Sequence, residues 1–473
     1  MSIETTAESS SMNVLLIRPR PSRETIGLQH VMICEPLELE YLAAGIADLG
    51  HQVDILDMIL EKRPLPDLLN EFQPDLVAMT GYISHVRIIK AMADTIKAWS
   101  AACLTVVGGV HAEVVPDDFQ HPNLDAIICA NGMTTFRDLV CCAAAGQPLT
   151  GQSFQELPGV WLPGKARPVK KTSFQQPFPD RTKVARYRHR YYYLFHNPCA
   201  LIKTSFGCPF QCNFCFCREI TDHQYFERPL AEVMEELSLI PEQEIYIVDD
   251  NFLVNPDRVI TFCAELEQRG LDKRFLIYGR ADFIAAHPEV IQRFAANGLR
   301  AVIVGIESCL DQDLDRFNKK STLAMNEQAV AVLAENQVDC YATMILGMDW
   351  SSADFRNLSR WLKKMDLSFV NLQPFTPLRG TAAGEGYEES LRIPRSEYEK
   401  WDLAHLVLRP SKISVTSYYW NIIRVYYSVT FRPKSMLSLL RRFGFAENLR
   451  LFLGSSRVTL QYFGKVLRNM GKG

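Results

Sequence analysis

The stretch SFGCPFQCNFC at residues 205–215 places three cysteines on a segment that is poorly suited to a regular helix. Cys208, Cys212 and Cys215 are spaced four and three residues apart, and Gly207 and Pro209 disfavour a helix around the first of them. Thiolates on such a loop can bind three corners of an iron-sulfur cube and leave the fourth corner open. The stretch therefore predicts a cluster with a vacant coordination position.

Two other interpretations of the cysteines stay open at this point. Soft thiolates also suit zinc, but structural zinc sites usually have four ligands in two close pairs, and no second pair lies at a suitable distance. Cys217 is a spare candidate, although its short offset from Cys215 fits a cube poorly. The simplest alternative is that these are ordinary buried cysteines in a chain that contains thirteen.

The cysteine stretch lies early in a repeated strand-helix pattern that covers residues 198–385. Short β-branched runs alternate there with helical patterns, and the cysteines follow the first run. Six such steps predict a partial (β/α)6 barrel or a second open sheet. The predicted strands are 200–204, 244–248, 275–278, 301–304, 342–346 and 369–372.

A similar pattern precedes it, over residues 13–150. An open parallel sheet binds ligands where its strands end, and here those ends carry glycine and small polar residues. The fold class is therefore α/β, with an N-terminal Rossmann-like domain ahead of the barrel. The predicted strands of this domain are 13–17, 52–56, 76–80, 104–107 and 126–129.

Three further segments complete the predicted organisation. Residues 1–12 form a disordered polar tail, and the proline-rich residues 151–197 form a linker. Residues 386–473 form a basic, aromatic-rich helical region. From Arg409 onward there are twelve basic residues and a single acid, Glu447, although the whole chain has a formal net charge of −3.

The basic region has three interpretations. Cations interleaved with apolar clusters, such as 418–420 and 451–453, suit an interfacial helix on an anionic membrane leaflet. They also suit a helical cap over the barrel whose basic face is solvated. Nucleic-acid binding is disfavoured, because no recognised binding module accompanies the charge. We therefore expect no nucleic-acid partner and leave peripheral membrane contact open.

The cysteine usage and the N-terminal residues bear on localisation. Thirteen cysteines is an odd number in a long chain, and residues 1–11 are polar, without the apolar core of a signal peptide. No apolar run approaches the roughly 20 residues that cross a bilayer. These observations predict the reducing cytoplasm, with contact at the inner face of the membrane left open.

The Cys-x3-Cys-x-aromatic-Cys pattern, with Phe214 as the aromatic residue, resembles the radical S-adenosylmethionine superfamily. The resemblance implies a 4Fe-4S cluster held by Cys208, Cys212 and Cys215, whose fourth iron binds S-adenosylmethionine and cleaves it to a 5'-deoxyadenosyl radical. It also implies S-adenosylmethionine contacts at the strand ends, although Arg280 could instead pair with Asp282 or Glu307 inside the barrel. The implied contact residues are Phe214, Asp249, Asp250, Arg280 and Glu307.

The preceding domain, with EPLELEYLAA at residues 35–44, is similar to cobalamin-binding domains. The Asp-x-His-x-x-Gly motif that supplies a lower axial histidine in many cobalamin proteins is missing, so we expect cobalt without a histidine ligand. The alternative is a sheet that has lost its cofactor and serves for docking. The implied cobalamin contacts are Thr80, Gly81, Tyr82, Ser84, Gly108, Gly109 and His111.

The domain order and the segment WDLAHLVLRP at residues 401–410 resemble cobalamin-dependent radical enzymes that act on hopanoids and bacteriochlorophyll precursors. The resemblance implies methyl transfer to an unactivated carbon of a hydrophobic polycyclic substrate, with hopanoid C-3 methylation preferred. The alternative with the same cofactors is tetrapyrrole methylation or oxidative cyclisation. An alternative of another class is a non-catalytic cobalamin sensor. The enzyme would also need an electron donor such as flavodoxin or ferredoxin.

Overall fold

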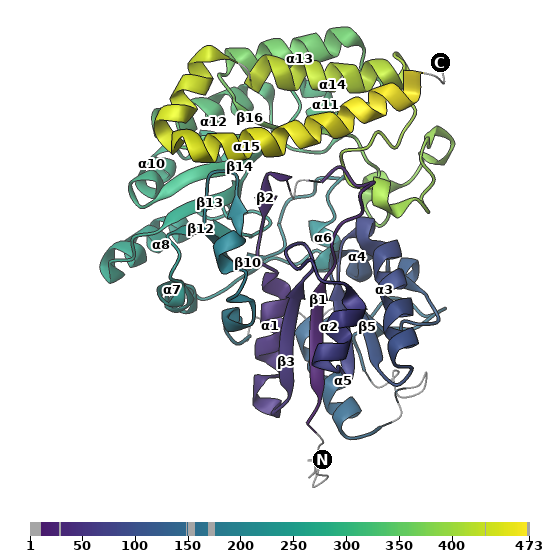
Figure 1. Cartoon of the computed structure of the whole chain (residues 1–473). Coiled ribbons are helices and arrows are strands. Elements are labelled where there is room, and N and C mark those ends of the chain that lie inside the picture. The colour runs from purple at the N-terminus through teal and green to yellow at the C-terminus, as the bar shows by residue number, and fades with distance from the viewer. Residues whose placement is uncertain are drawn as a thin grey trace. The chain divides into compact units, whose positions relative to one another are not determined.

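The computed structural model describes residues 11–27, 30–147, 149, 157–168, 176–430 and 432–470 (Figure 1). The chain divides into two compact units. Unit 1 comprises the described residues of Met1–Thr25, Glu35–Arg188 and Glu219–Asp222, and unit 2 those of Ile26–Cys34, His189–Arg218 and His223–Gly473. Residues 1–10 of the predicted N-terminal tail lie outside the described residues, whereas Met12 is buried in unit 1.

Unit 1 is built on a sheet of five parallel strands and one antiparallel edge strand, in the order β3-β1-β4-β5-β6-β7. Helices cover a parallel sheet on both faces, which is why the four central residues of β1, Val14 to Ile17, are completely buried. The order places β1 between β3 and β4, so the ligand-binding crevice is expected where β1 and β4 end. The strands are β1 (Asn13–Arg18), β3 (Gln52–Asp57), β4 (Leu76–Thr80), β5 (Leu104–Gly108), β6 (Ala126–Ile128) and β7 (Val160–Trp161).

Apolar residues at three- and four-residue spacing over 37–49 predict one helix there, but α1 ends at Gly45. The chain continues as a 3-10 turn over Ala47–Leu49, and Gly50 follows in the left-handed region. The sequence pattern missed α2, a short helix that buries three leucines. The helices are α1 (Leu37–Gly45), α2 (Leu65–Phe72), α3 (Val86–Trp99), α4 (Val110–Val114) and α5 (Gly132–Ala144).

Unit 2 contains the predicted barrel. Its six parallel strands are neighbours in chain order, β9-β12-β13-β14-β15-β16, as in a partial (β/α)6 barrel. The strands are β9 (Cys199–Ile202), β12 (Glu244–Ile247), β13 (Arg274–Gly279), β14 (Leu299–Glu307), β15 (Asp339–Leu346) and β16 (Phe369–Pro374). Between them lie α7 (Leu230–Leu239), α8 (Pro256–Arg269), α9 (Ala281–Ala286), α10 (Pro288–Ala296), α11 (Asp311–Arg316), α12 (Leu323–Glu335) and α13 (Ser352–Lys364).

Two long helices end unit 2 (Figure 1). Helix α14 (Val415–Thr430) buries Tyr418, Tyr419 and Ile422 completely, and α15 (Pro433–Met470) packs along it. Helix α15 is interrupted at Gly444, whose φ of 72° is outside the helical region. Within the described residues, no helix combines the length and the apolar character that a membrane span requires. The predicted fold class, α/β with a helical C-terminal region, is confirmed.

Candidate functional site

The three cysteines lie on a loop held between two short strands of unit 2. Strand β10 (Ser205–Phe206) pairs antiparallel with β11 (Phe226–Glu227), and the loop between them begins at Gly207 with a φ of 76°. Gly207 donates its N–H to the Asp250 carboxylate at 2.9 Å. This contact fixes the loop to the end of β12, directly before the first cysteine.

The thiols of Cys208, Cys212 and Cys215 are half-buried and lie close enough to influence one another. Burial, with a smaller contribution from the neighbouring Cys215 and Cys212, raises the pKa of the Cys208 thiol to about 11. No three His, Cys, Asp or Glu side chains of the described residues converge on a single ion. A cubic cluster does not require such convergence, because each thiolate binds an iron of its own. The three neighbouring thiols of this loop therefore fit a 4Fe-4S cluster.

Two cations stand beside the second cysteine. Arg280 Nη1 lies 3.6 Å from Cys212 Sγ, and the Arg280 guanidinium stacks 3.8 Å from the centroid of the Phe210 ring. Burial raises the pKa of the Cys212 thiol, and the positive charges of Lys319 and Arg280 counteract part of that rise. Positive charge beside a thiol favours the thiolate, the form that binds iron. Sequence reasoning missed Lys319, which lies more than 100 residues from the loop in the chain.

The predicted S-adenosylmethionine contacts Arg280 and Glu307 both have partners within the protein. Arg280 pairs with Asp282 at 2.8 Å, the pairing that the sequence left open, and also donates to the carbonyl of Lys319 at 2.6 Å. Glu307 accepts from Lys319 Nζ at 2.8 Å, and both residues are 6% exposed. Arg280, Lys319 and Glu307 thus form one buried, hydrogen-bonded chain of charges beside the cysteine loop.

The acidic pair after β12 anchors the start of the loop. Asp249 is buried and accepts from Thr204 N and Oγ1 at 2.6 Å each and from Ser205 Oγ at 2.7 Å. Asp250 receives the Gly207 N–H and lies 3.5 Å from Lys203 Nζ. Both carboxylates therefore hold the loop in place.

Phe214 packs edge-on against Phe317, with a distance of 5.6 Å between ring centroids, and lies under the Lys319 ammonium. The structure therefore gathers all five predicted contact residues around the cysteine loop.

A cluster of tyrosines lines the strand face opposite the helices of unit 2, and the sequence analysis did not predict it. Tyr246, Tyr278 and Tyr341 alternate along their strands with residues that pack against the helices, so they occupy the inner face of the barrel sheet. Tyr193 lies on β8 (Tyr192–Tyr193), which pairs with β2 (Met32–Ile33). Its ring stacks on Tyr341 at 6.2 Å and meets Tyr246 edge-on at 5.2 Å.

The ligand-binding edge of unit 1 is shaped by backbone and small side chains. Gly109 has a φ of 96°, and a Cβ added there would come within 2.5 Å of Thr80 Oγ1. A Cβ at Gly81 would come within 2.8 Å of His85 Cβ, whereas one at Gly108 would make only ordinary contacts. Tyr82, which follows β4, is 59% exposed. The loops after β4 and β5 therefore approach each other so closely that only glycine fits at position 109, and the exposed Tyr82 ring beside them can lie against a bulky planar cofactor such as cobalamin.

Neither histidine at this edge is available as an exposed metal ligand. His111 Nε2 lies 2.8 Å from Asp118 Oδ2, and both side chains are buried. His85 Nδ1 accepts the Tyr82 N–H at 3.2 Å, and burial lowers the pKa of His85 to about 4. Ser84 and Thr80 are also buried. These contacts hold both histidines within the protein, and cobalt without a histidine ligand stays a prediction.

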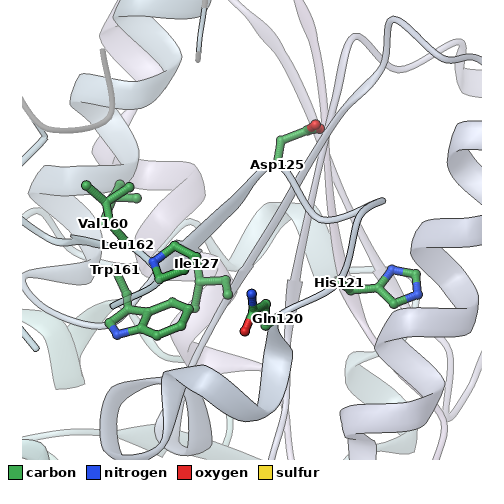
Figure 2. A pocket seen from close by; sticks show the side chains of 8 residues that line it. Gln120, His121, Asp125, Ile127, Val160, Trp161 and Leu162 are labelled. Carbon is green, nitrogen blue, oxygen red and sulfur yellow. The ribbon is translucent and has the colours of Figure 1, made fainter. Parts of the chain in front are cut away.

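A pocket of unit 1 lies at the other end of the sheet (Figure 2). Its lining includes Asp125, which directly precedes β6, and Trp161 of the edge strand β7. The Asp125 carboxylate accepts from Thr105 N at 2.7 Å and from Lys97 Nζ at 2.7 Å, so its hydrogen bonds stabilise the sheet. Of the segment 151–197 that was expected to be a linker, the described residues 157–168 and 176–188 belong to unit 1.

Comparison with known sequences gives two family matches. Residues 25–140 match the B12 binding domain, and residues 202–362 match the Radical SAM superfamily. Hopanoid C-3 methylase from Methylococcus capsulatus is 26% identical over 422 residues, which are 87% of this chain and 79% of that protein. Anaerobic magnesium-protoporphyrin IX monomethyl ester cyclase from Cereibacter sphaeroides is 23% identical over 402 residues, 80% of this chain and 64% of that protein.

Comparison with solved structures supports the same domain order. The radical S-adenosylmethionine methyltransferase TsrM from Kitasatospora setae, with cobalamin and a 4Fe-4S cluster bound, superposes with a TM-score of 0.68. The superposition covers 96% of this chain and 100% of that chain at 16% sequence identity, so the likeness concerns the fold. The predicted cofactors, a 4Fe-4S cluster, S-adenosylmethionine and cobalamin, are confirmed by the two matched domains. The chain therefore belongs to the radical S-adenosylmethionine enzymes that carry an N-terminal B12-binding domain.

Proposed function

We propose that the protein is a methylase that transfers a methyl group to an unactivated carbon of a hydrophobic polycyclic substrate. The observation that carries the proposal is a three-thiol loop, flanked by buried cations, in a chain that also has a B12-binding domain. When bound, the cofactors supply hydrogen abstraction and a transferable methyl group. The combination suits carbons that offer no lone pair or acidic proton.

The residues of the chain have distinct tasks in this proposal. Cys208, Cys212 and Cys215 hold the cluster, while Arg280 and Lys319 keep positive charge beside it. Asp249 and Asp250 fix the loop, and we assign Phe214, Arg280 and Glu307, with this acidic pair, to the S-adenosylmethionine site. The proposed cobalamin contacts are Thr80, Gly81, Tyr82, Ser84, Gly108, Gly109 and His111.

The tyrosine face of the barrel supports an apolar substrate. Tyr193 packs on Tyr246 and Tyr341, which are 6% and 5% exposed, so the ring surface left open on this face is that of Tyr278 at the end of β13, which is 38% exposed. Aromatic rings bind flat apolar molecules through large contact areas. Together with the name of the Methylococcus relative, this face makes a hopanoid methylated at C-3 our first choice of substrate.

The test is an anaerobic assay of the reconstituted enzyme with a hopanoid that lacks the methyl group, S-adenosylmethionine labelled in its methyl group, and reduced flavodoxin or ferredoxin. We expect labelled product that is one methylene heavier, and none from a Cys212→Ala variant. In cells, deletion of the gene should remove the methylated compound. Failure to methylate any hopanoid would overturn the choice of substrate.

The second candidate is oxidative cyclisation or methylation of a tetrapyrrole, which the Cereibacter cyclase relative favours. The label separates the two reactions. Turnover of a tetrapyrrole without transfer of the labelled methyl group would favour cyclisation, whereas labelled tetrapyrrole would favour side-chain methylation.

A further inference from the structure

Helices α14 and α15 carry most of the large hydrophobic side chains that are exposed among the described residues. Phe445 is 74% exposed, Leu460 68% and Leu467 63%, values that are unusual for side chains of this size. Soluble monomers rarely present a continuous apolar patch of this kind unless it binds something. The other exposed apolar residues of the pair are Trp420, Tyr427, Met436, Leu437, Leu440, Leu449, Phe452, Leu453 and Phe463.

The part of α15 that follows Gly444 has two apolar stripes on opposite faces. Val458, Tyr462 and Val466 form the first stripe, which packs against the core of unit 2. Gly454 lies so close to the His30 backbone that a Cβ would collide with it, so this face is firmly seated. At 100° per residue, the second stripe points away from the first. This solvent stripe consists of Phe445, Leu449, Phe452, Leu453, Leu460, Phe463 and Leu467.

Basic residues run along one edge of the solvent stripe. Arg450, Arg457 and Arg468 are separated by seven and eleven residues, which places them in one row beside it. Arg457 and Arg468 are exposed and supply the cationic border. Arg450 instead pairs with Glu447, donates to the Leu194 carbonyl at 2.5 Å and lies over the Tyr192 ring. An apolar stripe with a cationic border is the pattern of helices that lie in the interface of an anionic bilayer.

We infer that the solvent stripe of α15 docks unit 2 on the surface of an anionic lipid bilayer. From Phe445 to Leu467 the stripe is about 33 Å long at 1.5 Å per residue. A bilayer surface is continuous, so it can contact the stripe along its whole length. A second copy of the chain would bring its own row of arginines to the contact and would meet repulsion. The inference does not depend on the proposed activity.

The test is cosedimentation of the full-length protein with vesicles of phosphatidylcholine mixed with phosphatidylglycerol, and with vesicles of phosphatidylcholine alone. We expect binding to the anionic vesicles that weakens as salt is added. The variant Leu453→Glu, Leu460→Glu, Leu467→Glu should bind at least about tenfold more weakly. Because all three side chains are exposed, its circular dichroism spectrum should match that of the wild type.

A matched control places the same charges on exposed apolar positions elsewhere in unit 2. Leu239, Ile260 and Met325 are 66%, 43% and 41% exposed, so Leu239→Glu, Ile260→Glu, Met325→Glu should bind vesicles as the wild type does. The inference is overturned if the wild type does not bind anionic vesicles, or if the α15 variant binds them equally well. It is also overturned if the wild type forms a dimer that only the α15 variant dissociates and neither protein binds vesicles.

Discussion

The cysteine loop of unit 2 and the ligand-binding edge of unit 1 are built by different means. Around the loop, Arg280, Lys319 and Glu307 form a buried, hydrogen-bonded chain of charges, and Arg280 also contacts the Cys212 thiol. At the edge of unit 1, Gly81 and Gly109 lie so close to His85 and Thr80 that no larger residue fits, and the histidines are buried and paired. A site made by side-chain chemistry should fail when a side chain is removed. A site made by shape should fail when atoms are added.

The largest effect is expected from loss of a thiol. Replacing Cys208, Cys212 or Cys215 with alanine should abolish both the visible absorbance of the cluster and the activity, because each thiolate binds one iron. Cys141→Ala is the matched control, since Cys141 is exposed on α5 of unit 1. A Cys212→Ala variant with a full cluster and normal activity would refute the assignment of the loop.

The chain of charges beside the loop should matter for stability. Lys319→Met leaves the Glu307 carboxylate buried without its cation, so we expect the free energy of unfolding to fall by about 3 kcal/mol. The double variant Lys319→Met, Glu307→Met should recover most of that loss, because no charge then remains buried. Urea unfolding of the three proteins measures both values, and equal losses in the single and double variants would argue against the pairing.

At the edge of unit 1, the buried His85 should make stability depend on pH. Its pKa is lowered to about 4 in the folded chain from an unperturbed 6.5, so only the unfolded state takes up a proton between these values. Stability is therefore fully present above pH 6.5 and falls as the pH drops toward 4, by about 3 kcal/mol in total. His85→Asn, which keeps an acceptor for the Tyr82 N–H, should flatten this slope. An unchanged slope would show that His85 is not the titrating group.

The smallest effect tests the shape of the edge. Gly109→Ala places a Cβ against Thr80 at a φ that L-residues rarely adopt, and we expect cobalamin binding at least about tenfold weaker. Gly50→Ala is the control, since Gly50 also has a positive φ but nothing within 4 Å. Cobalamin content after equilibrium dialysis measures both. Equal binding by the two variants would contradict the role given to this glycine.

The sequence predicts the regular parts of the molecule well, for physical reasons. Buried parallel strands such as β1 and β4 are continuous apolar runs, and their bounds follow directly from the pattern. Helix α2 was not predicted, because eight residues are fewer than the window in which a helical repeat of apolar residues is usually recognised. Strand β7 is two residues long and gains its identity only from pairing with β6.

In the candidate site too, residues that belong to a local sequence pattern are predictable, whereas residues brought in by tertiary contacts are not. The cysteines are predictable because their spacing is local, and the structure places the other predicted residues nearby. Lys319 lies far along the chain from the cysteine loop, and Tyr193 lies far from Tyr341, on which its ring stacks. No local sequence pattern marks either residue. On α15 the sequence shows apolar residues at helical spacing, but only tertiary packing decides which of its two stripes is buried.

One chain is expected to hold both the iron-sulfur cluster and the corrinoid. Protein purified without oxygen and reconstituted with iron, sulfide and hydroxocobalamin should contain iron and sulfide in equal amounts, as a 4Fe-4S cluster requires, together with one corrinoid per chain. Iron, sulfide and cobalt analysis of the same gel-filtered sample measures all three. A sample that retains neither iron-sulfide nor corrinoid would contradict the account.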